Sequence, residues 1–173
     1  MDKGTIRIKW NVDEKYDAYS VCVKENEEKE LVKIFNPNIN SISIADCIKG
    51  KEYNFIVWGI DNNSNYSKIC EFFSFFNGKK TITYLYKTPE LLNAIVKENA
   101  AIISWNPING NNEYLIIRKC ENGKWQRVGI SRKAYFIDTA FDSTKKNFYS
   151  VRCFDAENDR MLSSFDTKGI LLK

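Results

Sequence analysis

Residues 102–117 read IISWNPINGNNEYLII, and residues 6–21 read IRIKWNVDEKYDAYSV. In the second of these stretches Trp10 ends one apolar run, and Tyr19, nine residues later, opens the next. The first stretch has the same spacing between its tryptophan and its tyrosine, with turn-forming Asn, Pro and Gly between them. One pattern written twice predicts that one structural unit is built twice.

Alternation of polar and apolar residues dominates the chain, and this period of two is typical of strands with one buried face. It is clear over 5–10 and 41–44, while 53–59 forms a longer run with apolar groups on both faces. Turn residues separate these runs, for example at 61–65, and no stretch shows convincing helical periodicity. Many short strands with turns every 8–12 residues or so predict a β-sandwich.

The second half of the chain repeats the order of the first half. Its predicted strands cover 101–105, 114–118, 125–130, 134–137 and 148–154, and a hairpin turn falls at 121–124. Trp105 follows Trp10 by 95 residues, and Asp155 follows Asp61 by 94. A repeat of this size fits two domains better than a solenoid, whose repeats span about 20–50 residues. We therefore expect one domain at 1–87 and a second at 88–173.

These features resemble the fibronectin type III family. Trp10 and Trp105 match the core tryptophan of that family, and the segment around Tyr53 resembles its tyrosine corner. Segment 149–155 matches the same strand in the second half, although Asn147 stands at the place of the corner tyrosine. The resemblance covers nearly the whole chain. It implies an all-β fold of two tandem immunoglobulin-like (fibronectin type III) β-sandwiches.

The first domain departs from the family pattern in two ways. It begins at what would be the second strand of the family, so strand A is expected to be missing. Residues 71–86 (EFFSFFNGKKTITYLY) are longer and more aromatic than a simple last strand. We interpret them as an extra β-hairpin at the end of the first domain, turning at Asn77 and Gly78.

The motif order of the second domain resembles fibronectin-like repeats of bacterial surface and glycan-handling proteins. The motifs are Trp-Asn-Pro, Tyr-x-Ile-x-Arg-Lys, Asn-Gly-Lys-Trp and Tyr-Phe-Ile-Asp. This resemblance implies a non-catalytic binding, docking or spacer module of a larger bacterial protein that handles glycans or is associated with the envelope. The expected partner is another protein or the remainder of the parent chain, and self-association is left open.

Catalysis is not expected from the residue types present. The chain has no histidine, and its five cysteines form no C-x-x-C pair, so neither a zinc site nor a cofactor is predicted. Acid–base or nucleophilic chemistry would need a poised group in a pocket, and no such constellation stands out. Asp61 and Asp155 recur at turns, where they are expected to cap the loops. We predict that the chain is not an enzyme.

The charge distribution argues against a nucleic-acid partner. The net charge is +4; there are 12 basic and 12 acidic residues before Tyr86, and 14 basic and 10 acidic residues after it. This excess is too small for a dedicated nucleic-acid binder. No stretch approaches the roughly 18 consecutive apolar residues of a membrane span. The sequence therefore predicts neither a nucleic-acid partner nor a membrane span.

The compartment itself is left open. Scattered cysteines argue against a disulfide framework, and Cys120 and Cys153 should lie far apart in antiparallel strands. Unpaired cysteines and the lack of a signal-peptide pattern favour the cytoplasm. The resemblance to bacterial surface proteins favours the envelope or secretion instead.

Two candidate surfaces emerge from the pattern. If Tyr53 and its alternate residues point inward, the large apolar side chains of Ile56, Trp58 and Ile60 point outward. They could be covered by the extra hairpin or the neighbouring domain, or they could contact a partner or a second copy. The second candidate is a basic cluster around Trp125, which could bind an anionic glycan or remain a solvated strand face. Its members are Arg118, Lys119, Lys124, Trp125, Arg127, Arg132 and Lys133.

Overall fold

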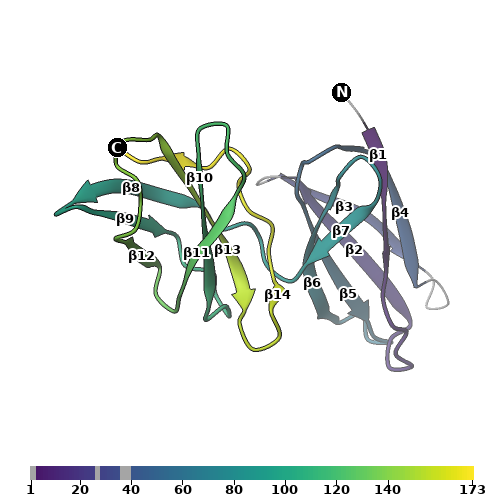
Figure 1. Cartoon of the computed structure of the whole chain (residues 1–173). Coiled ribbons are helices and arrows are strands. Elements are labelled where there is room, and N and C mark those ends of the chain that lie inside the picture. Colours follow the sequence, from purple (N-terminus) through teal and green to yellow (C-terminus); the bar gives the residue numbers. More distant parts are fainter. Residues whose placement is uncertain (1–2, 26–27, 36–39) are drawn as a thin grey trace. The chain divides into compact units, whose positions relative to one another are not determined.

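The chain is built from strands arranged in two compact units, residues 1–85 and 86–173 (Figure 1). The computed structural model describes residues 3–25, 28–35 and 40–173. Within these ranges no helix is long and apolar enough to cross a membrane. The all-β prediction is confirmed. The units divide at Leu85 and Tyr86, two residues before the border expected from the sequence.

The first unit is a sandwich of two antiparallel sheets. One sheet pairs β1 (Lys3–Lys9) with β4 (Ser41–Ile48). The other has five strands in the order β3 (Glu28–Phe35), β2 (Ala18–Glu25), β5 (Tyr53–Ile60), β6 (Tyr66–Phe76) and β7 (Thr81–Tyr84). Strands β6 and β7 form the extra aromatic hairpin.

The repeated tryptophan and tyrosine meet in the core of the first unit. The ring centroids of Trp10 and Tyr19 lie 5.7 Å apart, and both side chains are buried. The Tyr19 hydroxyl accepts a hydrogen bond of 2.7 Å from the backbone N–H of Asp13, six residues upstream. The tyrosine thus packs on the tryptophan with its ring and holds the connecting loop with its hydroxyl.

The second unit also has two sheets. One contains β12 (Tyr135–Asp138), β9 (Ala100–Trp105) and β8 (Leu91–Lys97) in that order. The other contains β11 (Gln126–Ser131), β10 (Tyr114–Cys120), β13 (Asn147–Asp155) and β14 (Arg160–Met161), and β15 (Ile170–Leu171) also pairs with β13.

The core of the second unit repeats the contacts of the first. The ring centroids of Trp105 and Tyr114 lie 5.2 Å apart. The Tyr114 hydroxyl accepts a 2.8 Å hydrogen bond from the backbone N–H of Ile108, again six residues upstream. Equal spacing in the sequence therefore corresponds to equal geometry in the two sandwiches, and the predicted tandem organisation is confirmed.

The corner before the long strand is held by different chemistry in the two units. In the first unit the Tyr53 hydroxyl accepts a 2.9 Å hydrogen bond from the backbone N–H of Ile48. In the second unit Asn147 donates from its amide to the backbone carbonyls of Asp142, at 2.7 Å, and Lys145, at 2.8 Å. In both units the side chain bonds the backbone of the residue five positions upstream. Tyr53 accepts this hydrogen bond with its hydroxyl, whereas Asn147 donates it from its amide.

The two sandwiches differ at one edge. In the second unit β8 pairs with β9, whereas among the described residues of the first unit only β4 pairs with β1. The strand corresponding to β8 is the strand A that the sequence analysis expected to be missing. The small sheet of the first unit therefore has two strands where that of the second unit has three.

Candidate functional site

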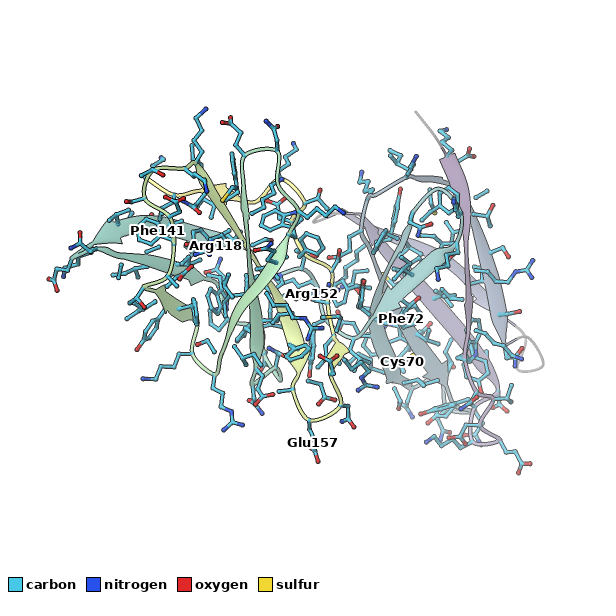
Figure 2. All side chains as sticks on the ribbon, in the orientation of Figure 1. Cys70, Phe72, Arg118, Phe141, Arg152 and Glu157 are labelled. Carbon is cyan, nitrogen blue, oxygen red and sulfur yellow. The ribbon has the colours of Figure 1, made fainter. Side chains whose placement is uncertain are left out.

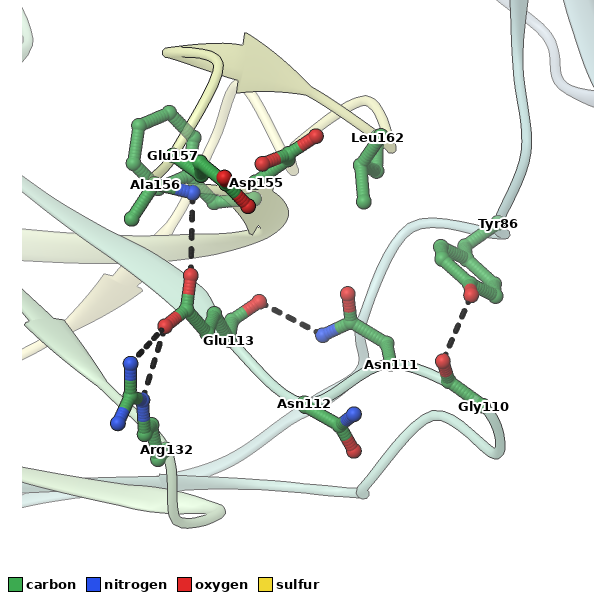
Figure 3. A pocket seen from close by; sticks show the side chains of 11 residues that line it. Tyr86, Gly110, Asn111, Asn112, Glu113, Arg132, Asp155, Ala156, Glu157 and Leu162 are labelled. Atoms are coloured by element: carbon green, nitrogen blue, oxygen red, sulfur yellow. Dashed lines mark hydrogen bonds and ion pairs between the residues drawn. The ribbon is translucent and has the colours of Figure 1, made fainter.

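A cleft of about 830 Å³ opens at one end of the second unit (Figure 3). It is formed by the start of the unit and by three connections: the loop before β10, the turn between β11 and β12, and the turn between β13 and β14. The lining residues are Tyr86, Gly110, Asn111, Asn112, Glu113, Arg132, Phe154, Asp155, Ala156, Glu157 and Leu162.

Glu113 joins the three connections that form the cleft. One carboxylate oxygen accepts a 2.8 Å hydrogen bond from Arg132 and the other accepts a 3.0 Å bond from the backbone N–H of Ala156. These donors, the Ala156 N–H first, hold the pKa of Glu113 below its usual value. Glu113 is therefore ionised at neutral pH and fixes the shape of the cleft.

Asn111, in the lining of the cleft, has a hydrogen-bond acceptor without a donor among the described residues. The residue is 9% exposed, and its amide N–H donates 2.7 Å to the backbone carbonyl of Glu113. Its side-chain oxygen is buried without a recorded partner in the structure. In Figure 3 this oxygen lies on the side of the amide group opposite the nitrogen that bonds the Glu113 carbonyl. A buried acceptor without a donor is costly, so a ligand that donates an N–H or O–H would be favoured here.

Two further carboxylates make the cleft electronegative. Asn158 donates hydrogen bonds to Asp155 and so lowers the pKa of that carboxyl group. Glu157 is exposed and lies at the tip of the turn after β13 (Figure 2). With Glu113 they outnumber the one basic residue in the lining, Arg132. The cleft therefore suits a cationic or neutral hydrogen-bond donor better than an anion.

The surface expected on the long strand β5 has little exposed area in the structure. Ile56 is 7% exposed and Ile60 is 8% exposed, and only Trp58 is half-buried. Their neighbours on β2, Ser20 and Cys22, are buried as well. The face predicted from alternation is present, but two of its three apolar side chains are not accessible.

An exposed apolar face occurs on the second unit instead, and the sequence analysis missed it. Ile102 of β9 lies opposite Ile95 of β8 and Ile137 of β12, so the three side chains form a row across one face of the sheet. Ile95 is 37% exposed and Ile137 is 51% exposed, with Tyr135 beside them at 43%. In the sequence, only consecutive apolar residues such as Ile102 and Ile103, which point to opposite faces of a strand, indicated that both faces of β9 are apolar.

The structure divides the basic cluster rather than gathering it. Arg118 points inward and forms a 2.6 Å ion pair with buried Asp138. Lys119 and Lys124 lie near the end of β10, whereas Arg132 and Lys133 follow β11 beside the start of β10. Two of the arginines also have carboxylate partners: Arg127 pairs with Asp159 at 2.7 Å and Arg132 with Glu113. Anionic-ligand binding by this cluster stays a prediction.

Trp125 contacts side chains of its own unit. The Lys119 ammonium lies 4.7 Å from the Trp125 ring centroid, and Phe165 packs edge-on against the ring at 5.7 Å. The Arg152 guanidinium lies 5.4 Å from the ring centroid of Phe165 (Figure 2 labels Arg152). Trp125 and Phe165, each in contact with a cation, thus pack on the small apolar cluster around Leu115.

The polar turns have the capping role expected from the sequence. The backbone N–H groups of Asn63 and Asn65 both donate 2.9 Å hydrogen bonds to Asp61. Asp155 accepts a hydrogen bond in the same way from the N–H of Asn158. Across the described part of the chain, no group of three or more Cys, Asp or Glu side chains could hold a metal ion.

The antiparallel register separates the two cysteines of the second unit. Cys120 lies opposite Asn147 at one end of the β10–β13 pair. Cys153 lies opposite Tyr114 at the other end. The thiols therefore belong to opposite ends of the sandwich, as the sequence analysis expected.

Comparison with known proteins gives likenesses in fold. No protein-family model matches the sequence, and no curated protein matches it. A solved Fn3-like protein from Clostridium thermocellum is 19% identical over 51% of this chain and 88% of its own, with a TM-score of 0.39. The FN1–FN3 domains of chicken CNTN1 are 16% identical over 98% of this chain and 62% of their own, with a TM-score of 0.35. A cytokine receptor complex is 9% identical, covers 95% of each chain and has a TM-score of 0.42.

Proposed function

We propose that this chain is a non-catalytic docking module that makes protein–protein contacts through the cleft of its second unit. The observation that carries the proposal is the Asn111 side chain in the lining of the cleft, whose buried oxygen has no hydrogen-bond partner among the described residues. The ionised Glu113, together with Asp155 and Glu157, surrounds this acceptor with negative charge. The partner would present a basic side chain to the cleft.

Arginine fits this cleft better than lysine does. A guanidinium group carries several N–H donors in one plane and can meet a carboxylate and an amide oxygen at once. The Glu157 carboxylate at the rim and the Asn111 oxygen at the base would accept different N–H groups of one arginine. Bonds of this kind, with a charged donor, are stronger than neutral ones.

The proposal also includes the parent protein. We infer a larger bacterial protein that handles glycans or is associated with the envelope, within which this chain serves as a docking or spacing part. The support for this step is the motif order of the second unit and a composition rich in Lys, Asn and Ile.

The test is a binding titration with defined probes. The peptides Gly-Arg-Gly-Arg-Gly and Gly-Gln-Gly-Gln-Gly, and panels of neutral and anionic glycans, are titrated at low and high salt. We expect saturable, salt-sensitive binding of the arginine peptide alone. Glu157→Gln should weaken it about threefold to fivefold, as loss of one partly exposed ion pair would. Glu14→Gln, the same charge change in the first unit, should leave it unaltered.

Other results would assign another function. Binding of neutral sugars that is lost in Asn111→Ala would make the cleft a glycan site. Binding of anionic glycans that weakens in Trp125→Ala or Arg127→Ala would support the basic cluster as an anionic-glycan surface. If no probe binds, the proposal that the cleft docks a partner fails.

A further inference from the structure

One edge of the first unit has the features of a site that receives a strand. Among residues 3–25, 28–35 and 40–173, β4 is the only strand that pairs with β1. In the second unit the corresponding strand β9 is paired on both sides, with β12 and with the seven-residue β8. The second unit therefore shows how a filled edge looks in this same sequence pattern.

Backbone hydrogen bonds identify which groups face the open edge. The backbone N–H of Trp10 donates 2.9 Å to the carbonyl of Asn40, on the side of β4. Successive residues of a strand direct their N–H and C=O groups to opposite sides. The backbone groups of Lys9 and Arg7 therefore point away from β4, toward the edge where no described strand pairs.

The second unit confirms this direction at the equivalent residues. Trp105 donates toward the β12 side, to the carbonyl of Ala134. The next residue, Asn106, donates 2.9 Å toward the β8 side, to the carbonyl of Glu90. With the offset of 95 residues, Asn106 corresponds to Asn11, the residue after Trp10.

A groove of about 430 Å³ runs beside the open edge. It lies between β1 and the β6–β7 hairpin and is lined by Arg7, Ile8, Lys9, Trp10, Asn11, Ile69, Cys70, Phe72 and Thr83. Ile69, Cys70 and Phe72 pack on the core but are only half-buried; Figure 2 labels the last two on β6. The core of the first unit is thus open on this side.

The inward side chain of β8 shows what the groove could receive. Ala94 of β8 lies opposite Ile103, is 1% exposed and belongs to the core of the second unit. Ile103 corresponds to Ile8, which lines the groove of the first unit. A strand paired with β1 in the same register would direct one side chain into the groove, opposite Ile8. The volume leaves room for a side chain larger than that of alanine.

Charge selects the kind of strand that fits. Arg7 and Lys9 are exposed and flank Ile8 on the other face of β1. Cations on an edge strand discourage pairing with arbitrary strands, and they would repel a second β1 placed opposite. Acidic residues at the two facing positions would convert this barrier into attraction.

We propose that the open edge of β1 binds an extended acidic segment of a partner polypeptide as an added antiparallel strand. An apolar residue of the partner lies opposite Ile8 and fills the groove, and carboxylates lie opposite Arg7 and Lys9. The backbone N–H and C=O groups of these two residues pair with the added strand. This site lies in the first unit and does not depend on the cleft of the second.

The probe is the fluorescently labelled peptide acetyl-Glu-Val-Glu-Leu-Glu-Val-Glu-amide, which has the length of β8. Binding is followed by fluorescence anisotropy, and hydrogen exchange reports the backbone amides of Arg7 and Lys9. We expect saturable binding and at least a tenfold slowing of exchange at both amides. The same peptide with lysine in place of glutamate should not bind.

Two variants of the chain separate the backbone contribution from that of charge. Arg7→Pro removes an N–H that faces the open edge and leaves those facing β4, an arrangement that edge strands tolerate. The double variant Arg7→Glu with Lys9→Glu keeps every N–H and reverses the charge. Each should weaken binding at least tenfold. Lys124→Glu with Lys168→Glu, the same charge change in the second unit, should change it less than twofold.

Three results would overturn the proposal. The first is the absence of saturable binding at millimolar peptide to the folded chain. The second is binding without protection of the Arg7 and Lys9 amides, or binding that Arg7→Pro does not weaken, which would indicate charge attraction alone. The third is a doubled mass in sedimentation equilibrium that Arg7→Pro abolishes, since the occupant would then be a second copy.

Discussion

At the level of single residues, the buried side-chain amide of Asn147 holds a corner of the second unit through two hydrogen bonds. Its N–H₂ group donates to two backbone carbonyls, those of Asp142 and Lys145, in a position that is 2% exposed. Tyr53 does the corresponding work in the first unit by accepting from one backbone N–H. The two residues hold equivalent corners with opposite hydrogen-bond polarity, so they should not be interchangeable.

Asn147→Asp tests this polarity with almost no change in shape. A carboxylate cannot donate to the two carbonyls, so we expect the free energy of unfolding of the second unit to fall by about 2–4 kcal/mol at pH 7. The measurement is urea denaturation followed by tryptophan fluorescence. The difference from the wild type should shrink toward pH 4, where a protonated carboxyl group can donate again. An equal loss at both pH values would contradict the assigned role.

The ion pair between Arg118 and Asp138 is a second contact in which a single side chain should matter for stability. Arg118 and the Tyr149 hydroxyl both donate to the same oxygen of Asp138, at 2.6 and 2.9 Å. Removing one partner of a buried pair leaves the other charge without compensation. We expect Asp138→Asn to lower the free energy of unfolding by about 3 kcal/mol in denaturant titrations. A loss below about 1 kcal/mol would show that solvent already compensates Arg118.

Tyr149 should make the stability of this unit depend on pH in alkali. Burial, and then its hydrogen bond to Asp138, raise the pKa of Tyr149 from its ordinary value of 10.0. The unfolded chain therefore loses this proton first, and the stabilisation that is complete below about pH 10 is lost as the pH rises further. Urea midpoints should fall more between pH 8 and pH 11 in the wild type than in Tyr149→Phe. Parallel pH profiles would contradict this.

At the level of elements, Glu113 ties together the connections that form the cleft. Its carboxylate links the start of β10 to Arg132 after β11 and to Ala156 after β13. Both contacts depend on its negative charge. The stabilisation they give is present above the ordinary pKa of a glutamate, and it is lost as the pH falls through the lowered pKa of the folded state.

Glu113→Gln is expected to loosen the turn after β13 without unfolding the sandwich. The neutral amide keeps the shape of the side chain but loses the charge-assisted bonds. Hydrogen exchange of the Ala156 amide should be faster than in the wild type at pH 7. In the wild type that exchange, corrected for its intrinsic rate, should accelerate as the pH falls through the lowered pKa of Glu113. The amide of Val151, in the middle of β13, is the control and should be unaffected.

At the level of the whole molecule, the two units should differ in stability. Among the described residues, the first unit closes its core with a two-stranded sheet, whereas the second has three strands at the same place. Fewer strands leave more backbone and more of the core open to water. The first unit should therefore open at a lower urea concentration than the second.

Two buried thiols, one in each unit, allow the unfolding of the two units to be measured separately. Cys47 of β4 is 2% exposed and Cys153 of β13 is 0% exposed. Thiol labelling across a urea series, read by mass spectrometry of the tryptic peptides, should modify Cys47 at a lower concentration than Cys153. Residues 86–173 expressed alone should keep the Cys153 midpoint, since that unit has its own core. Coincident midpoints in the full chain would mean that the units unfold together.

The sequence by itself determined the all-β class, the two-fold repetition and the loop-capping role of Asp61. It did so because these features are encoded by residues close together in the chain: the period of two, the spacing from Trp10 to Tyr19, and turn residues between strands.

Only the tertiary structure decided where the surfaces are. Alternation places Ile56 on an outer face but does not say that it is buried, and it did not reveal the exposed row at Ile102. The basic cluster falls within residues 118–133, yet Arg118 turns inward to Asp138 while Lys119 lies over Trp125. Exposure and pairing depend on which strands become neighbours and in which register, and these neighbours come from distant parts of the chain.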